Sequence, residues 1–348
     1  PRGDSLALSS RQKQELAEQE PLLRQNRQAR VTAIVSQLWL DAFRAQESIR
    51  LIEQDRSLFE HLVDATKASY SSALGRARQQ DIIRAQLELT RLDDRLTVLR
   101  QQSESAQQRL SEWVGGRARL PLAQLVPSQY GDEPTSVGSQ PDSDRLLYEQ
   151  VNRHPLLLAL DQRIDAMETG VELARQKYKP EWGLSAQYGY RDDDPMGRDR
   201  ADLFSVGVTF DLPLFTGKRQ DKDVSAATSR AEALKTDKLL MARKLMAELD
   251  TALVQLQRLN DRRALYAEQL LPQMSEQAEA ALAAYNNDDG DFAEAVRARI
   301  AELNAKIDFL TIRIDRLKMI AELNYLLSKN GSEPFPATSR EHAEGLTP

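Results

Sequence analysis

The sequence predicts a mainly α-helical protein, made of two long antiparallel helical hairpins in tandem repeat and one β-hairpin. Apolar residues recur at alternating spacings of three and four along most of the chain, which is typical of coiled-coil helices. This pattern stops at residues 182–212, where apolar residues instead alternate with small or polar ones. The part before that break is repeated after it with a period near 214 residues, so each copy is expected to form one helical hairpin.

Composition supports the helical prediction and argues against several functions. The 348 residues include only 15 glycines and 14 prolines, and charged residues of both signs make up 29%. Long helices and coiled coils have this composition. The net charge is -6 and no basic face is evident, which argues against nucleic-acid binding. There is no cysteine, which excludes disulfides and thiolate metal sites, and no apolar run reaches the roughly 20 residues of a transmembrane helix.

The first predicted helical hairpin covers residues 1–116. Its first helix is expected from about residue 6 to 68, with Pro21 as a point where the helix can kink. At 1.5 Å per residue such a helix spans roughly 90–100 Å. A short polar turn follows at residues 70–76, so the next helix should run antiparallel to the first. Its apolar stripe extends from Ala85 to Trp113.

The second predicted helical hairpin covers residues 213–330, and Pro272 is the expected kink in its first helix. The last helix carries two apolar stripes, so we expect neighbours on both of its sides, as in a closed wall of helices; an ordinary bundle core is the alternative. The two copies share landmarks at nearly constant offsets, which are 214 positions for Gly3 and Gly217 and 215 positions for Tyr70–Gly75 and Tyr285–Gly290.

Three other segments complete the predicted layout. Residues 117–154 are rich in proline, serine, glycine and aspartate and are predicted to be a linker with a short helix near its end. Residues 155–181 should form a helix, because Pro155 suits a first helical position. The polar residues 331–348 are expected to form a flexible tail.

Residues 182–212 are predicted to form a β-hairpin that crosses a membrane. Each apolar-alternating run has nine residues, within the ~9–11 that a tilted membrane strand needs. A soluble hairpin with one buried face is the alternative, but helices of this length offer it no partner sheet. Open strand edges cannot lie in lipid, so strands from further copies would have to close the sheet. The aromatic residues expected at the membrane interfaces are Trp182, Tyr188, Tyr190, Phe204 and Phe210.

These segments together resemble the TolC family of outer-membrane efflux proteins. The run Ala174–Trp182 precedes the alternating hairpin, and Phe210–Gly217 follows it with a proline and a glycine before a long helix. The similarity covers residues 1–330. Within the family, Asn152–Pro155 and Leu212–Phe215 are most similar to the branch that serves heavy-metal resistance pumps.

The resemblance implies a TolC-like fold, in which a homotrimer builds a β-barrel in the outer membrane and a helical tunnel in the periplasm. It also implies contact with outer-membrane lipid, a periplasmic adaptor protein and an inner-membrane pump of the RND type. The activity implied is passive export, without catalysis or a cofactor. Pro1–Gly3 matches the end of a second strand, so roughly 70 residues are expected to precede residue 1 by the repeat.

The hairpin tips are the predicted periplasmic entrance, where acidic residues repeated by threefold symmetry would form a ring that favours cations. Ion pairs to Arg297 or Arg299 could hold such a ring closed; the alternative is an ordinary polar turn. Gly75 and Gly290 are expected to serve their turns, together with Tyr70 and Tyr285, because glycine tolerates positive φ. The gate candidates are Arg76, Arg78 and Asp81 on the first tip and Asp288, Asp289, Asp291, Glu294 and Arg297 on the second.

Other functional classes have less support in the sequence. His61, His154 and His342 are far apart and lack metal-ligand spacing, so no metal site is predicted. Phosphate-binding loops and nucleophile motifs are not recognisable either. A periplasmic adaptor is the main alternative, but two tandem hairpins argue against it, because an adaptor should have one hairpin inside a lipoyl-like domain. A cytoplasmic coiled-coil scaffold would not explain the aromatic-edged strands.

Overall fold

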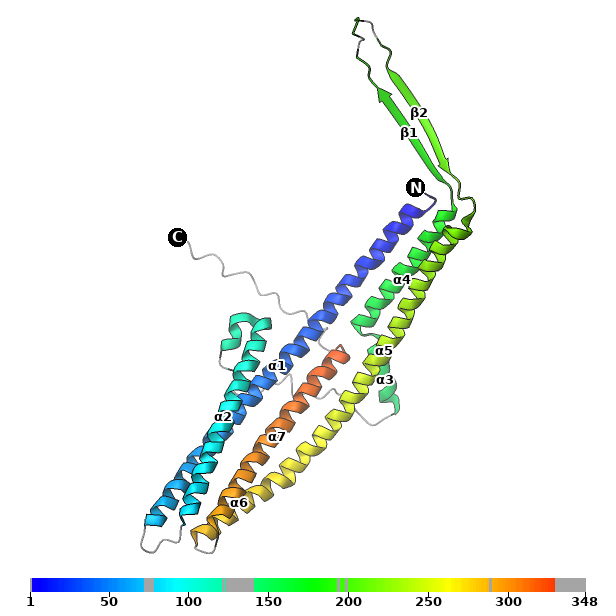
Figure 1. Ribbon diagram of the computed structural model, residues 1–348. Helices are drawn as coiled ribbons and strands as arrows, with labels where there is room; N and C mark the ends of the chain where they lie inside the picture. Colours follow the sequence, from blue (N-terminus) through cyan, green and yellow to red (C-terminus); the bar gives the residue numbers. More distant parts are fainter. Residues whose placement is uncertain are drawn as a thin grey trace, which may run out of the picture. The chain divides into compact units, whose positions relative to one another are not determined.

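The computed structural model shows a mainly helical chain, and its described residues form one two-stranded sheet (Figure 1). Two compact units are distinguished: Pro1–Arg27 with Glu149–Met246, called unit 1, and Gln28–Tyr148 with Ala247–Pro348, called unit 2. Within the described residues, no helix combines the length and the apolar character needed to cross a bilayer. The structure describes residues 2–71, 78–120, 122, 141–192, 195–197, 200–287 and 290–328.

Two long helices have segments in both units. The first, α1 (Ser5–Ser71), has 67 residues and corresponds to the predicted helix of the first hairpin. Pro21 lies inside α1 without ending it, although its ring removes one backbone hydrogen bond. The other is α5 (Gln220–Leu265), which corresponds to the first helix of the second repeat.

A π-helical turn separates α5 from α6 (Leu271–Asn286). This turn spans Tyr266–Leu270 and ends just before Pro272. Proline cannot donate a backbone hydrogen bond and its ring crowds the carbonyl four residues earlier, and a wider turn relieves both conflicts. At the position of the kink expected near Pro272, the helix therefore widens locally.

Unit 2 contains an apolar core shared by three helices. α2 (Gln79–Val114) and α7 (Phe292–Leu326) pack with α1 around one cluster of buried side chains. A second cluster continues this core along α1 and α7. The buried residues of the first cluster are Ile52, Phe59, Val63, Ala85, Leu92, Leu96, Phe292, Val296, Leu303 and Ile307.

Both apolar stripes of α7 are buried within the chain. Leu303 and Ile307 represent one stripe, and Ile312, Leu323 and Leu326 the other. The prediction that this helix has neighbours on both sides is consistent with this burial. Several apolar residues of α2 and α5 remain exposed, namely Ile83, Leu87, Val98, Leu239, Leu240 and Val254.

Helix α2 ends at Gly115, whose φ of 61° and whose N–H bond to the Ser111 carbonyl terminate the helix. A short 3₁₀ helix, η1 (Gly115–Arg119), follows. The next described helix is α3 (Pro141–Asn152). Residues 121 and 123–140 of the predicted linker, and all of the predicted tail at 331–348, lie outside the described residues.

Unit 1 is organised around α4 (Pro155–Arg175). Pro155 is the first helical residue, as predicted, and the His154 side chain caps the helix by accepting the Leu156 N–H at 3.3 Å. The start of α1 packs on α4, where Gln12 Nε2 donates to the Ala166 carbonyl at 3.0 Å. Lys238 of α5 bonds Asp161 of α4 at 2.5 Å, which fixes the third helix.

The sheet of unit 1 is one antiparallel hairpin, β1 (Glu181–Gly189) and β2 (Leu203–Asp211). Each strand has nine residues and begins one residue before the predicted apolar run. Short 3₁₀ turns join the strands to the helices, η3 (Gln176–Tyr178) before β1 and η4 (Thr216–Lys218) after β2. The hairpin therefore extends from the ends of α4 and α5.

Candidate functional site

One face of the hairpin is entirely apolar. The register places Trp182 opposite Phe210, Leu184 opposite Val208, Ala186 opposite Val206 and Tyr188 opposite Phe204. The rings of Trp182 and Phe210 lie 5.5 Å apart between centroids. Cross-strand pairs of aromatic and branched residues stabilise a sheet, so this face is a regular apolar surface rather than a scatter of residues.

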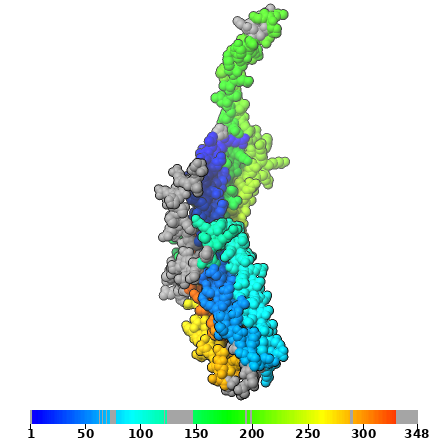
Figure 2. Space-filling view, turned by 90° about the vertical axis from the view of Figure 1, so that its left-hand side faces the viewer, coloured from blue at the N-terminus to red at the C-terminus, as the bar shows by residue number. Residues whose placement is uncertain are grey.

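This apolar face is exposed along its whole length. Leu184 is 78% exposed and Phe204 is 69% exposed. Figure 2 shows the hairpin as a narrow projection beyond the start of α1. A lone two-stranded hairpin is marginally stable in water, and a continuous exposed apolar patch marks a surface that something else covers. This face therefore requires lipid or another polypeptide as its partner.

The opposite face of the hairpin is small and polar. Gly183 pairs with Thr209, Ser185 with Gly207 and Gln187 with Ser205. The glycines leave room for the cross-strand hydroxyls, because a Cβ on Gly183 would lie 2.6 Å from the Thr209 hydroxyl oxygen and this side chain would have to rotate. An apolar face opposite a small polar face is the pattern of a strand pair between lipid and water.

The predicted aromatic residues frame the apolar face at both ends. Trp182 and Phe210 lie at the end next to the helices, and Tyr188 and Phe204 lie at the far end. Tyr190 follows the end of β1 and is exposed. Aliphatic residues fill the space between the two aromatic pairs. This order matches aromatic girdles on either side of an apolar band.

A charged cluster joins the base of the hairpin to α1. Arg2 Nε bonds the Glu181 carboxylate at 3.1 Å, and a second Arg2 nitrogen bonds the Asp211 carboxylate. Arg2 also donates to the Lys177 carbonyl at 3.3 Å. Since Glu181 begins β1 and Asp211 ends β2, a single guanidinium ties both strands to α1. Sequence reasoning missed this role of Arg2.

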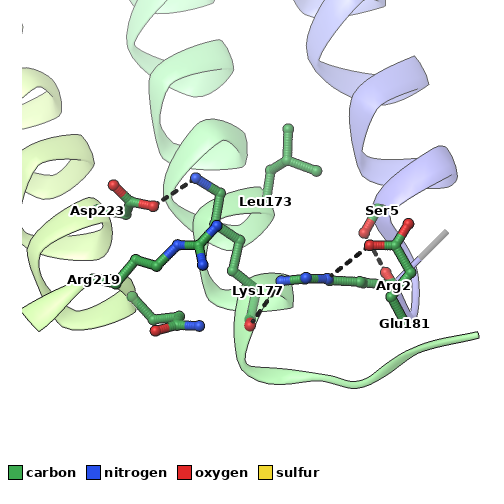
Figure 3. Close-up of a pocket in the computed structure, with 8 residues that line it drawn as sticks. Arg2, Ser5, Leu173, Lys177, Glu181, Arg219 and Asp223 are labelled. Carbon is green, nitrogen blue, oxygen red and sulfur yellow. Dashed lines mark hydrogen bonds and ion pairs between the residues drawn. The ribbon is translucent and has the colours of Figure 1, made fainter. Parts of the chain in front are cut away.

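A cavity of about 440 Å³ lies beside this cluster, within unit 1. Figure 3 shows Arg219, Lys177 and Asp223 on one side of it and Arg2 and Glu181 on the other. Lys177 Nζ bonds Asp223 at 2.6 Å, and this hydrogen bond lowers the pKa of Asp223. The lining residues are Arg2, Ser5, Leu173, Lys177, Glu181, Arg219, Gln220 and Asp223.

The structure describes only some of the gate residues predicted at the first helical tip. Asp81 is buried, and its carboxylate accepts the Arg78 backbone N–H at 2.9 Å. Asp81 therefore stabilises the start of α2. Its carboxylate satisfies a free backbone N–H group and interacts favourably with the positive end of the helix dipole. Tyr70 is exposed near the end of α1. Gly75 and Arg76 lie outside the described residues.

On the second tip, the structure describes two of the predicted acidic residues, Asp291 and Glu294. Asp291 caps α7 by accepting the Ala293 N–H at 3.2 Å, and Glu294 is exposed in the first turn of that helix. Arg297 donates to the Ala293 carbonyl at 3.0 Å. Asp288 and Asp289 lie outside the described residues.

The turn residues of the second tip are packed tightly. The rings of Tyr285 and Phe292 meet edge to face with centroids 5.3 Å apart. Gly290 is required by close backbone contact, because a Cβ there would lie 2.7 Å from the Tyr285 nitrogen. Its φ is not in the left-handed region, so the expected reason for this glycine was wrong.

A buried ionic cluster behind the tips was not predicted. Arg299 bonds Glu302 at 2.6 Å and reaches Asp55 of α1 at 3.6 Å. Lys306 bonds the other oxygen of Glu302 at 2.9 Å. Glu302 is only 2% exposed. In this cluster Arg299 forms ion pairs with Asp55 and Glu302, and the pair with Asp55 joins α7 to α1.

Comparisons with known proteins relate this chain to one protein family. The profile of the outer membrane efflux protein family matches residues 146–328. A search of curated protein sequences found no match. Among the described residues, no group of three or more histidines or carboxylates could hold a metal ion.

Several solved structures share the fold at low sequence identity. The chain matches the channel-forming protein CusC with a TM-score of 0.81 and 14% identity, over 93% of this chain and 74% of that one. The outer membrane protein VceC of Vibrio cholerae matches with a TM-score of 0.74 and 16% identity, over 93% and 75%. The MtrE outer membrane channel of Neisseria gonorrhoeae, in its open state, matches with a TM-score of 0.74 and 15% identity, over 93% and 72%.

Proposed function

The chain belongs to the outer membrane efflux protein family, and from this membership we propose that it forms a homotrimeric export channel. Its hairpin would cross the outer membrane, and its helices would build a conduit through the periplasm. Substrate would pass from the periplasm to the exterior. The chain would supply a path and a gate, and the driving force would come from a partner pump.

The two-faced hairpin is the observation that carries this proposal. Its apolar face is exposed and framed by aromatic pairs, and its other face is small and polar. Among the described residues no further strand pairs with either edge of this sheet, and open edges cannot lie in lipid. Strands of further copies are therefore required to close the sheet. The exposed apolar residues of α2 and α5 are suitable contacts between such copies.

The tips are the proposed gate. Glu294 is exposed beside the capping Asp291, and threefold symmetry would repeat these carboxylates around the entrance. Asp288 and Asp289 are proposed to belong to the same acidic ring. Such a ring favours cations over anions. Asp81 and Arg78 are proposed to support the first tip, since their bond is within one helix end.

The partners are proposed from the same arrangement. A passive conduit needs an energy source, so we propose a tripartite assembly with a periplasmic adaptor and an inner-membrane pump of the RND type. The proposed layout assigns residues 1–116 and 213–330 to the periplasm and residues 182–212 to the outer membrane. Export of heavy-metal ions or of drugs would both use this path.

Paired substitutions on the two faces of β2 test the membrane assignment. Val206 lies mid-strand on the apolar face, and Ser205 is its neighbour on the polar face. An arginine at the bilayer midplane costs about 2–4 kcal/mol on the lipid side. Val206→Arg should therefore reduce the amount of full-length chain in the outer-membrane fraction, while Ser205→Arg should leave it close to the wild-type amount.

The mass of the detergent-extracted chain, measured by light scattering, tests the trimer. A trimer that forms only in detergent or membrane supports the channel. A monodisperse, water-soluble monomer that never enters the membrane fraction, or equal loss in the two arginine variants, would contradict it.

A further inference from the structure

We propose that Leu214 and Phe215 form an interfacial anchor, which inserts between lipids at the periplasmic surface of the outer membrane. Both residues lie in the connection between β2 and α5, outside the strands themselves (Figure 1). The anchor is therefore separate from the aromatic residues that frame the hairpin. This inference rests on the proposed function, because it takes the hairpin to cross the membrane, and it adds a second lipid contact to that of the strands.

The connection after β2 exposes an unusual run of apolar side chains. Phe215 is 96% exposed, Leu214 is 71% exposed and Leu212 is 51% exposed. By contrast, Phe59 and Phe292 of the helical core are almost completely buried. Single apolar residues on a surface need no explanation, but three within four positions, next to the exposed apolar face of β2, make a continuous patch. Such a patch marks a surface that something else covers.

The backbone presents the Phe215 ring at a cost to the fold. Its φ of 59° and ψ of 56° lie in the left-handed region, which an aromatic residue adopts only under strain. Immediately before it, the Leu214 N–H donates to the Leu212 carbonyl at 2.9 Å, which makes a tight turn around Pro213. Glycine or asparagine would suit this position better. A strained and fully exposed phenylalanine gains little within its own chain, so its stabilising contact is expected outside the chain.

The place of these residues along the chain favours lipid over a second copy of the protein. Copies that close the sheet would pair along the strand edges, and the ladder of β2 ends at Asp211. Leu214 and Phe215 lie beyond that end, where no strand edge is offered. The alternation of Phe210 and Leu212 also leads directly from the apolar face into the patch. Lipid that covers the face can therefore cover the patch as well.

The expected depth of the patch agrees with an interfacial contact. β2 leads back toward the helices, and its last aromatic residue, Phe210, stacks near Trp182 at the end of the face next to the helices. That pair is the expected girdle at the periplasmic interface. Leu214 and Phe215 follow on the periplasmic side of it, at the level of the headgroups. Phenylalanine and leucine are typical of segments that lie in this layer without crossing it.

Spin labelling of the full chain tests the anchor, because the sequence contains no native cysteine. A nitroxide on Phe215→Cys is measured in vesicles of phosphatidylethanolamine and phosphatidylglycerol. Relaxation by oxygen, which partitions into lipid, is compared with relaxation by a water-soluble nickel chelate. We expect the oxygen effect to exceed the nickel effect at position 215. Ser229→Cys is the matched control, because Ser229 is exposed further along α5, and there the nickel effect should dominate.

A third label, on Val208→Cys, separates this inference from the proposed function. Val208 lies mid-strand on the apolar face and reports whether the hairpin is in lipid. Lipid exposure at 208 with water exposure at 215 would overturn the anchor alone, whereas water exposure at both would contradict the membrane assignment. Low accessibility of position 215 to both reagents would show burial against another copy, and would also overturn the anchor.

A second background keeps the test valid if the label at position 215 disturbs the turn. Leu214→Cys leaves Phe215 in place, and its label should also relax more with oxygen than with nickel. Adding Phe215→Asn removes the ring but suits the left-handed backbone. The label at 214 should then shift toward the nickel effect, because the ring no longer holds the turn in the interface. An unchanged ratio would show that Phe215 does not anchor the chain.

Discussion

Glu181 and Asp211 face each other across the two strands at the base of the hairpin, and Arg2 forms ion pairs with both. Like charges directly opposite each other destabilise a strand pair. The guanidinium converts this repulsion into a bridge and holds the hairpin against the start of α1. The base of the hairpin is therefore fixed by charge, whereas the rest of it is paired through apolar residues.

Removing the bridge should loosen the base of the hairpin. Arg2→Gln is expected to lower the unfolding free energy by about 1 kcal/mol, because it loses two exposed ion pairs and restores the repulsion. Urea denaturation in detergent measures the change. Adding Glu181→Gln should recover part of the loss, since it removes the repulsion. A double variant no more stable than Arg2→Gln would contradict this account.

The ionic cluster behind the tips should contribute more to the unfolding free energy than the Arg2 bridge does. Arg299→Leu leaves Asp55 and the nearly buried Glu302 short of a counter-charge. Loss of one partner in such a cluster typically costs about 3 kcal/mol. The exposed pair between Arg258 and Asp261 is the control, and Arg258→Leu should cost about 0.5 kcal/mol or less. Equal costs in urea denaturation would show that burial of the cluster has no energetic effect.

Gly290 should resist substitution for a different reason. Gly290→Ala places a Cβ against the Tyr285 nitrogen and the Ala284 backbone. The turn must shift, and we expect a loss of about 1–3 kcal/mol. Gly116→Ala is the control, because no atom lies within 4 Å of a Cβ at that position. Comparable melting temperatures for the two variants would refute the steric explanation.

The pair of Lys177 and Asp223 should give stability that depends on pH. Its hydrogen bond and charge lower the pKa of Asp223 from the ordinary value of 3.8. The carboxylate therefore stabilises the folded state above that ordinary value, and the contribution is lost as the pH falls through the lowered pKa. Denaturation of wild type and Lys177→Met, from about pH 6 to about pH 3, should show a difference that shrinks on acidification. A constant difference would argue against the assignment.

The fold was largely predictable because its signals are periodic. Spacings of three and four identified the long helices, and alternation by two identified both strands. The strands begin one residue earlier than predicted, because Glu181 and Leu203 enter the ladder through backbone pairing that the apolar pattern does not reveal. Pro272 was correctly singled out, but sequence alone does not specify that the helix widens there.

The sites formed by distant charges were not predictable in this way. Arg2, Lys177 and Arg219 meet only because three helix ends come together, and no local spacing encodes that meeting. Asp55 lies one position from Arg56, where the apolar stripe of α1 is broken. That break was a usable signal for a buried charge, although its partner Arg299 could not be identified from it.

The π turn has a consequence for how the two copies diverged. Gly3 and Tyr70 are 67 positions apart, whereas Gly217 and Tyr285 are 68 positions apart. A π turn accommodates one additional residue without shifting the residues beyond it to another face. The turn Tyr266–Leu270 lies within the longer interval and can hold this residue. The second helical hairpin could thus gain one residue while the residues of its tip kept the same helical faces as those of the first hairpin.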